Sequence, residues 1–169
     1  MLYVKRVLEP VLLEYLDSFP VVGITGPRQS GKSTFIKEML GANYRYISLD
    51  ENNILEFFQD DPVKFMEVYH DKVIFDEAQL APDLFRAIKV IVDNNREQYG
   101  KFVITGSRQF NLLKQIFESL AGRIGLLSLL PYQAKEMPQN LIKQAPFNHI
   151  TLGICFRGLI HYIFITTVL

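Results

Sequence analysis

The fold of this chain is decided by the stretch Val21-Val22-Gly23-Ile24-Thr25-Gly26-Pro27-Arg28-Gln29-Ser30-Gly31-Lys32-Ser33-Thr34. Gly26 to Ser33 satisfies the pattern G-x-x-x-x-G-K-[ST]. The glycines let a phosphate approach the backbone closely, and backbone N–H groups at a helix start attract it. Lys32 can reach the β- and γ-phosphates, and the Ser33 hydroxyl can ligate Mg²⁺. The stretch therefore predicts a phosphate-binding loop made of Gly26, Pro27, Arg28, Gln29, Ser30, Gly31, Lys32, Ser33 and Thr34.

The alternative is a chance match within a glycine turn. The surroundings disfavour it, because an apolar run precedes the loop and Phe35, Ile36, Met39 and Leu40 then share one helical face. Gly41 follows where a helix C-cap belongs. We therefore expect a buried strand, the loop and a helix in this order.

Composition limits the kinds of protein to consider. The chain has 169 residues, of which 49% are hydrophobic, so we expect a globular core. Eighteen basic and eighteen acidic residues balance to zero net charge, which does not favour a dedicated nucleic-acid surface. Cys155 is the only cysteine, and the N-terminus lacks the apolar core of a signal peptide. We therefore expect a cytoplasmic protein without disulfides.

Apolar periodicity predicts strands that alternate with helices. Helices are expected from Pro10 to a break at Pro20, over 54–69 with a break at 61–62, from 82 to a stop at Gly100, and around 112–120. Besides the strand before the loop, strands are expected at 44–49, 73–75, 102–105 and 124–130. This order predicts an α/β fold of the P-loop NTPase type, with a five-stranded, mainly parallel sheet between helices.

Polar residues follow two of these strands at their carboxyl ends, where parallel sheets bind ligands. Asp76 and Glu77 follow the strand at 73–75, and Ser107 follows the strand at 102–105. Asp76 fits a role in holding Mg²⁺, and Glu77 a role in orienting the attacking water. The alternative for the acidic pair is an ordinary helix N-terminus. Ser107 is the candidate to contact the γ-phosphate or the water; Thr105 competes for this role, and a plain turn residue is the alternative.

Arg123 follows Leu120-Ala121-Gly122 at the end of a predicted helix. An arginine can stabilise charge on the transferring phosphoryl group, either in its own chain or from a neighbouring subunit. A solvated cation at a helix C-terminus explains the residue equally well. The residues alone leave these two interpretations open.

At these residues the chain resembles the AAA-type ATPases of bacteria and archaea in which an AAA_14 ATPase core precedes a DUF4143 domain. The phosphate loop is generic, but an Asp-Glu-x-Gln, a Thr-Gly-Ser and a Leu-Ala-Gly-Arg motif in this order are more specific. The matching pieces, within residues 3–137, are Thr25 to Thr34, Ser48-Leu49-Asp50, Phe75-Asp76-Glu77-Ala78-Gln79, Thr105-Gly106-Ser107, Glu118 to Arg123 and Leu129-Leu130-Pro131.

The resemblance implies an ASCE-type ATPase that uses ATP and Mg²⁺, with Ser33 and Asp76 at the metal. It implies a catalytic Glu77, a sensor at Ser107 and a functional arginine at Arg123, and Arg108 departs from the small polar residue expected there. It also implies a longer protein, with an ATPase core at 1–137 and a truncated or divergent start of a C-terminal region at 138–169. Homo-oligomers, and a protein or nucleic-acid partner of the C-terminal domain, belong to the same expectation.

Two functions from different classes remain. The first is a Mg²⁺-dependent ATPase core, which the retained Lys32, Ser33, Asp76 and Glu77 favour. The second is a nucleotide-binding remnant with little turnover that acts as an interaction module, which the short C-terminal region favours. The apolar tail at 150–169 is not expected to span a membrane, because Arg157 lies near its middle.

Overall fold

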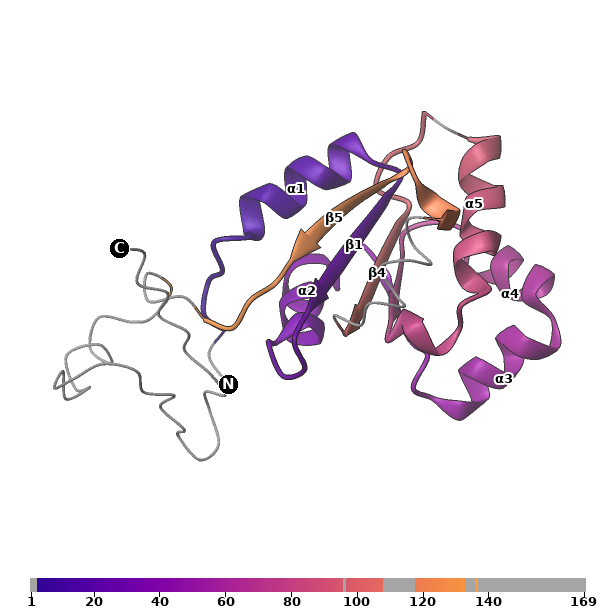
Figure 1. Ribbon diagram of the computed structural model, residues 1–169, viewed down its shortest axis with the longest axis horizontal. Helices are drawn as coiled ribbons and strands as arrows, with labels where there is room; N and C mark the ends of the chain where they lie inside the picture. The colour runs from indigo at the N-terminus through magenta and orange to yellow at the C-terminus, as the bar shows by residue number, and fades with distance from the viewer. Residues whose placement is uncertain (1–2, 96, 108–117, 133–135, 137–169) are drawn as a thin grey trace, which may run out of the picture.

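The computed structural model describes residues 3–95, 97–107, 118–132 and 136. These residues form a five-stranded sheet in the order β2-β3-β4-β1-β5, and every neighbouring pair is parallel (Figure 1). The predicted α/β class is confirmed, and the expected mainly parallel sheet is parallel throughout. The strands are β1 (Val21–Gly26), β2 (Arg45–Ser48), β3 (Val73–Asp76), β4 (Phe102–Ser107) and β5 (Ile124–Ser128).

The helices begin where the sequence places prolines and caps. Pro10 lies in the first turn of the first helix, where its missing N–H costs nothing. The Asp61 carboxylate accepts a hydrogen bond from the Lys64 N–H at 2.9 Å, and Pro62 then begins the fourth helix. The helices are α1 (Glu9–Ser18), α2 (Lys32–Leu40), α3 (Asn52–Asp60), α4 (Pro62–Val68) and α5 (Leu84–Asn94), with a 3₁₀ turn η1 (Ala78–Leu80).

Helices cover both faces of the sheet (Figure 1). On one face, α1 and α2 pack against strand residues that include Val22, Ile24 and Val103. On the other face, α3, α4 and α5 pack against strand residues that include Phe75 and Phe102. Burial on both faces explains the continuous apolar runs of β1 and β3.

The largest error among the predicted boundaries is that of α5, which ends at Asn94 and not at Gly100. Gly100 instead adopts φ +58° in the turn before β4, and its N–H donates to the Phe19 carbonyl at 2.8 Å. Smaller errors are at β5, which ends at Ser128 and not at residue 130, and at β4, which continues to Ser107. Most of the helix predicted around 112–120, the single cysteine and the tail from 138 onward lie outside the described residues. Within the described ranges no helix is both long and apolar enough to cross a membrane.

Candidate functional site

The loop between β1 and α2 depends on two glycines for different reasons. Gly31 caps α2 with φ +85°, a conformation that L side chains rarely adopt. An added Cβ there would have open space, with only Arg6 Nη1 within 4 Å, at 3.8 Å, so backbone conformation is what requires glycine. At Gly26 the requirement is space, because a Cβ would lie 2.2 Å from the Leu129 carbonyl oxygen.

Lys32 is buried and lies across its own loop. Its ammonium donates to the carbonyl oxygens of Gly26 at 3.1 Å and Pro27 at 2.9 Å. Burial lowers the pKa of this ammonium, and the carboxylates of Glu77 and Asp76 oppose that shift. Lys32 therefore already lies in the field of the acidic pair that follows β3. Of the other predicted loop residues, Ser30 is buried and Ser33 half-buried, while Pro27, Arg28, Gln29 and Thr34 are exposed.

Asp76 ends β3 and is the centre of the site. Its Oδ2 accepts from the Ser33 hydroxyl at 2.7 Å and from the Tyr46 hydroxyl. Its Oδ1 accepts from the Thr105 hydroxyl and from the Glu77 N–H at 3.1 Å. Burial raises the pKa of this carboxyl, but the four hydrogen bonds outweigh burial and hold its pKa below the usual value. The Asp76 carboxylate is thus ionised and oriented, and it links β3 to α2, β2 and β4.

Glu77 lies beside Asp76 on an unusual backbone. Its φ of +56° is left-handed, which turns the chain sharply from β3 into η1. The Gln79 amide nitrogen donates to Glu77 Oε2, while Gln79 Oε1 is buried and has no hydrogen-bond partner among the described residues. A side chain of the following turn therefore holds the Glu77 carboxylate in place.

We call the side of the sheet where the parallel strands end its carboxyl edge, and the side where they begin its amino edge. The two remaining predicted residues lie at these opposite edges. Ser107 is the last residue of β4 and pairs in register with Gly26, so its backbone lies at the carboxyl edge beside the loop. The Arg123 carbonyl accepts from the Val21 N–H at 3.2 Å, at the amino edge. The five residue steps of β1 between these edges span about 17 Å. The Arg123 guanidinium instead contacts Asp93 at 2.5 Å and the Ala121 carbonyl at 2.9 Å.

Sequence reasoning missed the contacts of Tyr46, Gln79 and Arg6. Tyr46 lies in a short apolar strand and carried no local pattern that distinguishes it from a packing residue. Gln79 belongs to the Asp-Glu-x-Gln motif, but the motif alone does not predict its hydrogen bond to Glu77. Thr105, the competitor of Ser107 for the sensor role, instead donates its hydroxyl to the Asp76 carboxylate.

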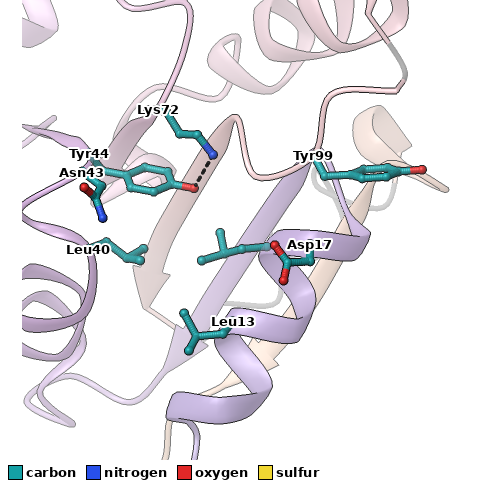
Figure 2. Close-up of a pocket in the computed structure, with 8 residues that line it drawn as sticks. Leu13, Asp17, Leu40, Asn43, Tyr44, Lys72 and Tyr99 are labelled. Carbon is teal, nitrogen blue, oxygen red and sulfur yellow. Dashed lines mark hydrogen bonds between the residues drawn. The ribbon is translucent and has the colours of Figure 1, made fainter.

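A separate pocket of about 450 Å³ lies at the amino edge of the sheet (Figure 2). Lys72 and Tyr44 point toward each other there, and both the Lys72 ammonium and the Tyr44 hydroxyl donate to the Gly100 carbonyl, at 3.0 and 2.6 Å. None of the predicted site residues lines this pocket, whose lining is Leu13, Leu16, Asp17, Leu40, Asn43, Tyr44, Lys72 and Tyr99.

The groups at the carboxyl edge fit a nucleotide and a divalent cation. The exposed loop ends on a left-handed glycine at the positive end of α2, which suits a phosphate. The Ser33 hydroxyl and the Asp76 carboxylate are hard oxygen ligands that already lie together, and Mg²⁺ binds such groups in company with substrate phosphates. The fold and site together define the phosphate-loop class of parallel α/β nucleotide-binding domains.

Comparison with known families agrees with this class. A family profile described as an AAA domain matches residues 18–138, which is more than half of the chain. The chain therefore belongs to this family, AAA_14, and the resemblance seen in its motifs is confirmed. The family and the fold together support a nucleotide-binding domain of the ATPase type.

Two mycobacterial relatives and one archaeal structure extend the comparison. The uncharacterized proteins Mb2031c of Mycobacterium bovis and Rv2008c of Mycobacterium tuberculosis are each 35% identical to this chain over 130 residues. That match covers 76% of this chain but only 29% of each relative. The Walker-type ATPase PABY2304 of Pyrococcus abyssi superimposes with a TM-score of 0.57 at 20% identity, over 79% of this chain and 55% of that chain. At that identity the likeness shows the fold alone.

Proposed function

We propose that this chain is the ATP-binding and Mg²⁺-dependent ATP-hydrolysing core of an AAA-type ATPase. The observation that carries the proposal is the 2.7 Å hydrogen bond from Ser33 to Asp76. These residues are 43 positions apart in sequence, and both are the types that hold Mg²⁺ in phosphate-loop enzymes. When bound, the metal neutralises charge on the phosphates.

The chain's own residues divide the remaining work. The loop from Gly26 to Thr34 binds the phosphates through its backbone, and Lys32 exchanges its carbonyl partners for phosphate oxygens. Glu77 orients the attacking water and accepts its proton, with its carboxylate held by Gln79. Ser107 ends β4 beside the loop and serves as the sensor of the γ-phosphate.

Arg123 has a different role in the proposed function, because it does not lie beside the loop. It lies at the amino edge, about 17 Å of strand away from the loop of its own chain. We infer that it stabilises phosphoryl charge in the site of a neighbouring copy, which makes a homo-oligomer the active form. To make that contact, the Arg123 guanidinium would exchange its ion pair with Asp93 for one with a phosphate.

The same position favours a second candidate, a nucleotide-binding module with little turnover of its own. A single chain does not bring Arg123 to its own phosphates, so an isolated chain binds ATP and turns it over slowly. We also propose that the ATPase core covers 1–137 and that a C-terminal region starts at 138. For that region we propose a protein or nucleic-acid partner, and for the protein a cytoplasmic location. The end of the family match at residue 138 supports the division.

The test is to compare the parent chain with Glu77→Gln for Mg²⁺-ATP binding by calorimetry and for phosphate release. We expect equal binding and loss of phosphate release in the variant, because the amide keeps the shape but cannot accept the proton. Phosphate release by Glu77→Gln at the parental rate would show that Glu77 takes no part in the reaction. Absence of ATP binding by the folded parent would overturn the proposed function.

A further inference from the structure

Arg6 is a buried arginine in the segment before α1, and it contacts three distant parts of the chain. Arg6 is only 4% exposed. Nη1 donates to the Ser30 carbonyl at 3.2 Å and Nη2 to the Leu130 carbonyl at 2.5 Å. Nε pairs with Glu136 Oε2 at 3.3 Å, and the guanidinium lies 4.4 Å from the centre of the Tyr132 ring. One side chain thus joins the phosphate loop to the segment that follows β5.

Burial makes this cation dependent on its partners, because an unpaired charge in the interior is costly. The Glu136 side chain is equally buried, at 3% exposed, and its other oxygen accepts from the Val7 N–H at 2.8 Å. The guanidinium fork holds several N–H donors in fixed directions, which suits two carbonyls and a carboxylate, and an ammonium group cannot match it. The arrangement therefore requires arginine rather than a general positive charge.

The contact with Ser30 acts on the part of the loop that turns into α2. In a trans peptide the C=O and the next N–H point in opposite directions. Because Arg6 holds the Ser30 carbonyl, the N–H of Gly31 points away from Arg6. The other end of the loop rests on the same segment, since Gly26 packs against the Leu129 carbonyl. Leu129 and Arg6 therefore support the loop at its two ends.

We propose that Arg6 is a positioning residue for the phosphate loop and couples phosphate binding to residues 129–132 and Glu136. The inference rests on the proposed nucleotide binding and adds a route by which the loop acts on the chain beyond β5. Coupling is reciprocal, so a phosphate that favours the held loop also favours the bonds from Arg6 to Leu130 and Glu136.

The test uses the full chain and a variant in which neither buried charge is left unpaired, Arg6→Met with Glu136→Met. Arg45→Met is the matched control, because Arg45 also lies over an aromatic ring, at 4.5 Å from the centre of Tyr69, but at the amino end of β2. Calorimetry measures binding of a non-hydrolysable ATP analogue with Mg²⁺, below the unfolding temperature of each variant. We expect the double variant to bind on the order of tenfold more weakly and the control to bind like the parent. Parental affinity in the folded double variant would overturn the positioning role.

Arg6→Lys and hydrogen exchange keep the inference testable if the double variant does not fold. Arg6→Lys, which retains charge without the fork, should bind the analogue with intermediate affinity. In the parent, the analogue should slow amide exchange over 129–132, and Arg6→Lys should weaken that protection. Unchanged exchange at 129–132 in a parent that binds the analogue would overturn the coupling alone. A parent that does not bind the analogue would overturn the proposed function as well.

Discussion

Replacing Tyr46 by Phe removes one hydrogen bond from the centre of the site and little else. The Tyr46 hydroxyl donates to Asp76 Oδ2, which the Ser33 hydroxyl also contacts. The ring stays in place, and so does the Lys37 ammonium at 3.9 Å from its centre. Asp76 keeps three other donors, so no carboxylate oxygen is left without a partner.

The size of the effect follows from the charge and the burial of this bond. Hydrogen bonds to charged groups contribute about 1.5–3 kcal/mol, and Tyr46 is only half-buried, so we take about 1.5 kcal/mol. For a chain of this length, that loss lowers the unfolding midpoint by about 3–6 °C.

Thermal unfolding followed by circular dichroism, without nucleotide, measures this shift. Tyr99→Phe is the matched control, because it makes the same change on a ring that is 50% exposed, and it should unfold like the parent. If Tyr46→Phe also unfolds at the parental temperature, the hydroxyl does not hold the Asp76 carboxylate, and the account of the site centre is wrong.

The remaining predictions concern binding and turnover. Lys32→Ala should weaken ATP binding sharply in calorimetry, because it removes the mobile cation of the loop while the loop amides remain; equal affinity would refute its role. Asp76→Asn should reduce the Mg²⁺ dependence of ATP binding, and an unchanged Mg²⁺ titration would place the metal elsewhere. Arg123→Ala should lower kcat far more than affinity, and mixing it with Lys32→Ala chains should restore part of the phosphate release. No recovery on mixing would argue against action between chains.

The sequence predicted the loop and its neighbours because their signals are local. The G-x-x-x-x-G-K-S pattern, the prolines at 10, 20 and 62 and the apolar runs each depend on nearby residues. The carboxyl-edge rule for parallel strands then brought Asp76 and Ser107 to the loop without any knowledge of the contacts. That rule also explains why Arg123 lies far from them, since it precedes β5 rather than following it.

The contacts that the sequence did not predict are long-range, and they produce no periodic pattern in the sequence. Arg6 reaches carbonyl oxygens 24 and 124 positions away, and any residue supplies a carbonyl. Tyr46 carries only the signal of a strand residue. The alternation in β2 predicts that its side chain is buried, but it does not predict the contact of its hydroxyl with the Asp76 carboxylate. The predicted stop of α5 at Gly100 failed because Asn95 ends the helix first and the glycine serves the next turn.

Phosphate release from ATP by the parent chain, measured with Mg²⁺ over a range of chain concentrations, decides whether this chain is an ATPase core. We expect Mg²⁺-dependent release whose rate per chain rises with concentration, because Arg123 of one copy completes the site of another. Nucleotide binding without release at any concentration would contradict the claim of an ATPase core and leave the nucleotide-binding module in its place.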